Sequence, residues 1–235
     1  MKEEFISAVS HELRTPLTSI RGALALVMSG AAGELPAKAR ELLAIAHRNS
    51  ERLVHIVNDI LDAEKIESGK MRINMQNVAL VPFLGQALAY NQPYAEKFKV
   101  CFRLDEPVPE VEVVADPDRL MQIVTNLLSN AAKFSPSGSE IILRAREEKN
   151  KIVVEVQDFG PGIPEAFRSH IFEKFAQAQH AGRENMEGAG LGLNLSRLLV
   201  ELMGGEIGFK TKTNEGTTFF VCLQPACAAN RWEVA

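Results

Sequence analysis

The sequence is short of cysteine, of net charge and of long apolar stretches. Its three cysteines lack the spacing of zinc ligands, and their small number indicates a reduced protein without a disulfide framework. The formal net charge of −4 argues against nucleic acid and against an anionic membrane surface as partners. No apolar run approaches the ~20 residues that a membrane-spanning helix needs, and no signal peptide follows Met1.

The 235 residues are enough for one large domain or two small ones. They begin abruptly inside a helical pattern, so we expect a fragment, the cytoplasmic portion of a longer protein. On this expectation, any membrane anchor belongs to missing upstream segments.

Two long amphipathic helices are predicted over residues 2–29 and 37–67, because apolar residues recur there every three or four positions. Two glycines and a proline break the pattern over residues 30–36. Residues 1–70 are therefore expected to form an α-helical hairpin. Two helices alone cannot enclose a core, so we expect a homodimer in which two hairpins form a four-helix bundle. The alternative is that the hairpin packs on the rest of its own chain.

Residues 71–225 are expected to form a second, α/β (α+β) domain with a largely antiparallel sheet. The pattern predicts helices over 82–98, 118–134 and 190–203, and strands over 100–104, 111–114, 139–146, 151–157, 207–210 and 217–223. Residues 176–189 have little apolar periodicity, which is typical of a functional lid or of disorder. Residues 226–235 carry no motif and are interpreted as a tail or a linker stub.

One face of the helix predicted over 118–134 is polar. Asn126, Asn130, Lys133 and Phe134 share this face at helical spacing, whereas the opposite face is apolar. Amide oxygens can hold Mg²⁺ beside phosphates, and a lysine suits phosphate as a point charge. Taken alone, these residues are more typical of a solvated polar helix face.

Two glycine-containing motifs follow predicted strands or open predicted helices. Asp158, Gly160 and Gly162 follow a strand, and a carboxylate at that position can accept a hydrogen bond from an exocyclic amine such as that of adenine. A glycine-rich turn over residues 188–192 opens a helix, which makes it an anion-binding candidate. It has neither the Walker A lysine nor the dinucleotide-binding glycine pattern. Each motif alone is also compatible with a plain turn, as is Gly-Thr-Thr-Phe over 216–219.

The first predicted helix contains a histidine, an acid next to it, a threonine one turn later and then Pro16, in the run H-E-L-R-T-P-L. A proline inside a helix costs roughly 3 kcal/mol, so its presence there indicates a functional role. The order of the motifs along the chain indicates what that role is. The blocks H-E-L-R-T-P-L, N-L-L-S-N-A-A-K-F, D-F-G-P-G, I-F-E-K-F, G-A-G-L-G-L and G-T-T-F resemble, over essentially the whole chain, the catalytic core of sensor histidine kinases.

The resemblance implies a dimerisation and histidine-phosphotransfer hairpin followed by a Bergerat-type ATP-binding domain. It implies that His11 is the phospho-acceptor, and that Glu12 orients its imidazole and accepts a proton. Thr15 would position the water that dephosphorylates a partner. Pro16 would bend the helix, so that the ATP-binding domain docks in more than one pose.

The same resemblance implies that ATP and Mg²⁺ are bound by the second domain. Asn130 would ligate Mg²⁺ with support from Asn126, Lys133 would contact phosphate, and Phe134 would stack near adenine. Asp158 would bind the adenine amine, with Gly160 and Gly162 allowing the close approach. The remaining expected nucleotide contacts are Gly188, Gly190, Leu191, Gly192 and Thr217. Residues 176–189 would form a mobile ATP lid anchored by Phe172 and Phe175.

The chain departs from the family pattern at two positions. Gln177 stands where many members have an arginine that reaches the γ-phosphate, and Arg183 is either its substitute or a solvated lid charge. Ala189 stands where a threonine is common, which removes one hydroxyl near the phosphates. His47, His55, His170 and His180 have no metal-ligand spacing and are interpreted as surface or structural residues.

The function predicted in this way is an ATP-dependent protein histidine kinase that passes its phosphoryl group to an aspartate on a response-regulator receiver domain, with phosphatase activity as well. Two alternatives stay open: an ATPase from another Bergerat branch, and a catalytically silent scaffold. The sequence does not name the signal or the response regulator. It also leaves open whether phosphorylation is in cis or in trans.

Overall fold

The structure is a computed structural model that describes residues 2–31, 33–177 and 189–226, with the side chains of the first helix described from Thr15 onward. The chain divides into two compact units, Met1–Met71 and Arg72–Ala235. Within the described residues, no helix combines the length and the apolarity that crossing a bilayer requires.

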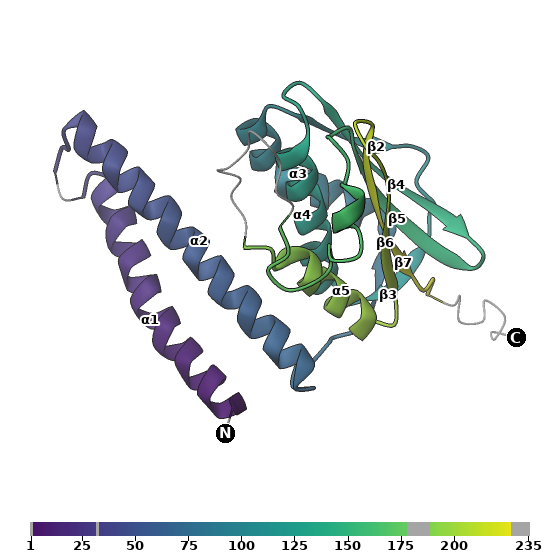
Figure 1. The fold of residues 1–235 in the computed structure, drawn as a ribbon, viewed down its shortest axis with the longest axis horizontal. Coiled ribbons are helices and arrows are strands. Elements are labelled where there is room, and N and C mark those ends of the chain that lie inside the picture. The colour runs from purple at the N-terminus through teal and green to yellow at the C-terminus, as the bar shows by residue number, and fades with distance from the viewer. Residues whose placement is uncertain (1, 32, 178–188, 227–235) are drawn as a thin grey trace, which may run out of the picture. The chain divides into compact units, whose positions relative to one another are not determined.

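The first unit is a helical hairpin of α1 (Lys2–Met28) and α2 (Ala37–Glu67), which lie side by side (Figure 1). Both predicted helices are confirmed, and Pro16 lies inside α1. The hairpin's described core is small, consisting of Leu17, Val57 and Leu61 with Val54 packed against them. Large apolar side chains on its surface stay exposed, namely Ile20, Leu26, Leu42, Ile45 and Leu53.

The second unit is a sheet covered on one face by helices. Its helices are α3 (Leu80–Phe98), α4 (Pro117–Phe134) and α5 (Gly192–Leu202), with a short 3-10 turn at Glu165–Phe167. Its main strands are β2 (Cys101–Asp105), β4 (Glu140–Glu148), β5 (Lys151–Asp158), β6 (Glu206–Lys212) and β7 (Gly216–Leu223), in the order β2-β4-β5-β7-β6. The three helices lie on one face of this sheet (Figure 1).

The sheet is largely antiparallel, as predicted, since only β2 and β4 run parallel. A separate pair joins β1 (Gln76–Ala79) to β3 (Glu112–Ala115). The apolar pattern predicts no strand at β1. Three of its four residues are exposed, so it lacks the alternating apolar pattern that marks a strand.

The helix α4 carries the apolar core of this unit on one face, and Asp116 fixes where it begins. The Asp116 carboxylate accepts hydrogen bonds from the backbone N–H groups of Asp118 and Arg119, and Pro117 is the first helical residue. The fully buried side chains of α4 pack with those of β4 and β5: Leu120, Ile123, Leu127, Leu128, Ile141, Leu143 and Ile152. Burial of one face leaves the opposite face of α4 half-exposed.

Candidate functional site

The end of β5 carries a buried carboxylate held by two backbone donors. Asp158 is 5% exposed, and its Oδ1 accepts hydrogen bonds from Gly160 N–H at 2.8 Å and Thr217 N–H at 3.2 Å. Burial raises the pKa of this carboxyl above its ordinary value, while the two N–H donors act against that shift. Both hydrogen bonds end on one oxygen, so among the described contacts Oδ2 is left for another donor.

The glycines beside Asp158 are required by close approaches within the protein. A Cβ at Gly160 would lie 2.8 Å from the carbonyl oxygen of Phe134. The glycine therefore allows the segment after β5 to pack closely against the end of α4. Gly162, with φ of 72°, leaves no room for a Cβ against the backbone of Lys212. Gly216, with φ of 110°, lies against the backbone of Asp158. These contacts bring three motifs that are distant in sequence to one place.

The polar face of α4 lies beside the start of α5. Asn126 Nδ2 donates to Ser196 Oγ at 2.9 Å, and Asn130 Nδ2 makes a long contact of 3.4 Å with Asn126 Oδ1. Lys133 Nζ lies 4.9 Å from the ring centre of Phe134. The four side chains predicted on this face are all half-buried, which distinguishes the face from a fully solvated one.

The first turn of α5 has no side-chain cap, so its backbone N–H groups are free of the usual competitor for an anion. Gly190, with φ of 70°, packs against the backbone of Phe175 and Ala176, and Leu191 is buried. Asn194 donates from Nδ2 to the Phe172 carbonyl at 2.9 Å. The segments before and after residues 178–188 are thus held together.

Thr217 is buried opposite Thr211 across β6 and β7, with their hydroxyl oxygens 3.0 Å apart. Thr211 also donates to the Gly216 carbonyl and accepts from Ile163 N–H. Asp158, Thr211 and Thr217 line an open hollow of about 270 Å³, together with Gln157, Lys210, Lys212, Glu215, Gly216 and Thr218. Sequence reasoning missed Thr211 and Ser196, because only strand register and helix packing place them at the site.

The phospho-acceptor candidates belong to the other unit. His11 and Glu12 lie within the helix α1, and their side chains are outside the described ones. Thr15 is exposed, four positions after His11 and therefore on the same helix face. The predicted residues Gly188, Arg183 and His180, and most of the predicted lid, also lie outside the described residues, as does the tail from 227 onward. Among the residues that are described, no three His, Cys, Asp or Glu side chains form a metal cluster.

Two family patterns match this chain. The pattern described as the His Kinase A (phospho-acceptor) domain matches residues 1–69. The pattern described as the histidine kinase-, DNA gyrase B- and HSP90-like ATPase matches residues 115–226.

Curated relatives are similar over most of this chain. The circadian input-output histidine kinase CikA of Synechococcus elongatus is 39% identical over 224 residues, which are 94% of this chain and 30% of the relative. The signal transduction histidine-protein kinase BarA of Escherichia coli strain K12 is 35% identical over 226 residues, 94% of this chain and 24% of the relative. The chain therefore spans less than a third of the length of these relatives.

Solved structures share the fold. The full-length structure of ShkA in complex with AMPPNP superposes with a TM-score of 0.77 at 29% identity, covering 97% of this chain and 47% of that one. The Acinetobacter baumannii histidine kinase AdeS superposes with a TM-score of 0.65 at 22% identity, covering 91% of this chain and 97% of that one. The likeness to AdeS concerns the fold alone.

Proposed function

Because the chain belongs to the sensor histidine kinase family, with a phospho-acceptor domain before a histidine kinase-type ATPase domain, we propose that it phosphorylates its own His11 with ATP. The observation that carries the proposal is the convergence at Asp158. A buried carboxylate with one oxygen held by two backbone donors lies beside the end of α4 and the start of β7. An ordinary turn does not require a buried acid.

The nucleotide fits these residues by its chemistry. Asp158 Oδ2 accepts the adenine amine, and Thr217 lies beside it across the strand pair. Phe134 provides an aromatic face for the base, and Lys133 beside its ring provides a charge for the phosphates. Gly190, Leu191 and Gly192 bring the uncapped first turn of α5 to the phosphates, and Gly188 extends this loop in sequence.

The magnesium ion fits the amide oxygens of α4. Asn126 is engaged at both ends of its amide, by Ser196 and by Asn130. Asn130 uses only its Nδ2 in these contacts, so its side-chain oxygen, Oδ1, is the ligand proposed for Mg²⁺. The contact with Asn126 orients the Asn130 amide. Bound with ATP, the ion supplies charge neutralisation at the phosphates.

The chain's own residues carry the transfer. One ring nitrogen of His11 forms a bond to the γ-phosphorus as the bond to the ADP oxygen breaks, and Glu12 accepts the proton from the other nitrogen. The phosphoryl group then passes to an aspartate of a receiver domain. Thr15, exposed one turn from His11, positions water for the reverse dephosphorylation of that partner.

The hairpin supports a homodimer. Its exposed apolar residues include Leu26 at 64% and Leu42 at 61% exposure. Several large apolar side chains exposed together on one hairpin indicate a surface that another protein chain covers. A second hairpin covers them in a four-helix bundle.

Incubation with γ-labelled ATP and Mg²⁺ tests the proposal, beside His11→Gln and the control His47→Gln, a second histidine of the hairpin. We expect an acid-labile, base-stable label in the wild type and in the control, and none in His11→Gln. ATP hydrolysis without a labelled histidine would instead support an ATPase of another branch. Failure to bind a fluorescent ATP analogue would support a silent scaffold.

A further inference from the structure

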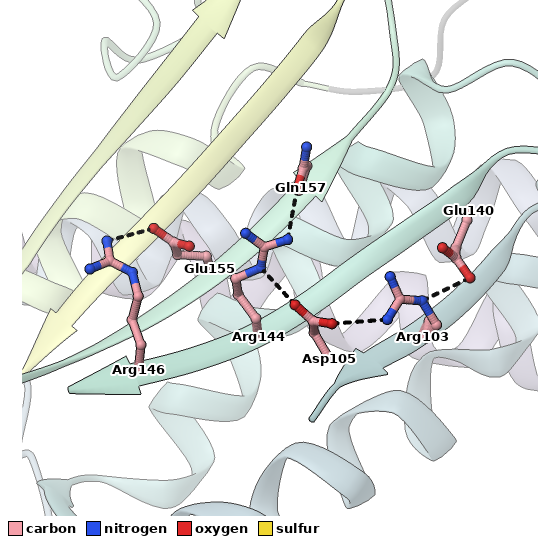
Figure 2. Close-up of polar contacts among 7 residues, drawn as sticks. All are labelled: Arg103, Asp105, Glu140, Arg144, Arg146, Glu155 and Gln157. Carbon is pink, nitrogen blue, oxygen red and sulfur yellow. Dashed lines mark hydrogen bonds and ion pairs between the residues drawn. The ribbon is translucent and has the colours of Figure 1, made fainter. Parts of the chain in front are cut away.

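The sheet face opposite the helices is divided into two parts of different character. The first part lies over β2, β4 and β5 and carries a ladder of ion pairs (Figure 2). Its contacts are Arg103 to Glu140 at 2.9 Å and to Asp105 at 3.0 Å, Arg144 to Asp105 at 3.3 Å and to Gln157 at 3.1 Å, and Arg146 to Glu155 at 2.9 Å. Three guanidinium groups balance three carboxylates, so this part of the sheet face carries no net charge.

The second part is a hollow of about 270 Å³ between the β4–β5 turn and β6 and β7. Val153, Cys222 and Phe220 form its apolar floor. Because Gly208 has no side chain, the Phe220 ring lies across β6, where a Cβ would collide with three of its ring atoms. The other lining residues are Arg146, Glu148, Lys149, Lys151 and Lys210.

The rim of this hollow has more positive than negative charge. Arg146 is engaged by Glu155 and Glu148, and Lys151 by Glu206 at 2.7 Å. Lys149 and Lys210 have no ion-pair partner within 4.0 Å among the described residues, although Lys210 Nζ lies 6.0 Å from the Phe220 ring centre. Apart from the Arg146–Glu155 pair, which belongs to the ladder, three lysines stand against two acids, Glu148 and Glu206, which leaves one positive charge in excess around an apolar floor.

We propose that this hollow, the Phe220 hollow, is a docking site for an acidic segment of a partner protein that inserts one apolar side chain onto Phe220 between Lys149 and Lys210. Charge complementarity selects the acidic partner, because the neighbouring ladder is neutral, whereas Lys149 and Lys210 lie at the rim of the apolar floor without an ion-pair partner within 4.0 Å among the described residues.

Binding of a fluorescent peptide, acetyl-Glu-Asp-Phe-Asp-Glu-amide, to the whole chain tests this proposal by anisotropy. We expect saturable binding that weakens several-fold between 50 and 300 mM salt, and about tenfold weaker binding when serine replaces the peptide's phenylalanine. Lys149→Glu/Lys210→Glu should weaken binding by about tenfold or more. The matched control is Lys38→Glu/Lys99→Glu, which changes the net charge equally. Lys99 shares with Lys149 a left-handed backbone (φ of 54° and 49°), so both replacements meet the same local strain.

Two cysteines on the same sheet face give a second readout in a Cys227→Ser background. The peptide should slow alkylation of Cys222, in the hollow, and leave that of the exposed Cys101 on β2 unchanged. Equal binding by the two double variants, or equal binding of the serine peptide, would overturn the proposal. So would a lysine-dependent association with phosphatidylserine vesicles in the absence of peptide binding, because the occupant would then be a lipid surface.

Discussion

The side-chain oxygen of Asn126 occupies the space that a side chain at Gly192 would need. This contact joins the polar face of α4 to the first residue of α5, and it continues through the hydrogen bond from Asn126 to Ser196. The amide proposed to orient the Mg²⁺ ligand and the backbone proposed to bind phosphate therefore hold each other in place.

Gly192→Ala should displace the Asn126 amide, because the new Cβ cannot coexist with it. We expect at least a tenfold loss of affinity for a fluorescent ATP analogue. The control is Gly85→Ala, in the interior of α3 where nothing lies within 4 Å. It should leave nucleotide affinity unchanged and stabilise the fold by up to ~1 kcal/mol, through helix propensity. Equal affinities in the two variants would contradict the proposed role of this contact.

Asp158→Asn should separate folding from nucleotide binding. Burial raises the pKa of Asp158, so its stabilising contribution belongs to low pH and is lost as pH rises through the folded pKa. Above the folded pKa the carboxylate therefore adds no stability, and the side-chain oxygen of asparagine can still accept from Gly160 and Thr217. We expect an unchanged or higher melting temperature, with ATP-analogue affinity reduced by a factor of ten or more. Wild-type affinity in this variant would argue against adenine recognition by Asp158.

The hairpin should lose stability as the pH rises from about 4 to about 6. Burial is the main cause that raises the pKa of Asp59 to about 6, with Asp62 adding to the shift and His55 opposing it. A raised folded pKa stabilises the protein below the unfolded pKa, and this contribution disappears as Asp59 ionises. Asp59→Asn should raise the stability by about 1–2 kcal/mol at pH 7, after discounting for partial solvation, and by nothing at pH 4. Thermal unfolding at the two pH values measures this difference, and an equal gain at both would refute it.

Thr15→Ala should reduce the proposed phosphatase activity without reducing the labelling of His11. Thr15 is exposed on α1, so losing its methyl and hydroxyl groups leaves no cavity. We expect dephosphorylation of a phosphorylated receiver domain to slow by about tenfold or more, while the autophosphorylation rate stays within about twofold. The control is Thr18→Ala, another exposed threonine on the same helix. Parallel loss of both activities would assign Thr15 to the structure of the helix instead.

Much of the fold was predictable because its signals are local. The apolar spacing of residues 118–134 placed Asn126, Asn130, Lys133 and Phe134 on one face of a helix, and α4 has this arrangement. The hairpin helices and the strand pair β4–β5 were predicted for the same reason. The strand β1 was not predictable, because it owes its conformation to pairing with β3, more than 30 residues away.

The sequence by itself determined the order of the motifs, the periodicity of the helices and the chemical identity of each candidate group, since these depend on residue type and short spacing. Only the tertiary structure decided which groups meet. The β5–β7 register sets Thr217 against Asp158, and packing of α4 on α5 places Asn126 beside Gly192 and Ser196. It also decided what the glycines accommodate, because Gly160 and Gly162 make room for the backbones of Phe134 and Lys212. Such contacts join residues far apart in the chain and depend on packing of the whole domain, so no local pattern encodes them.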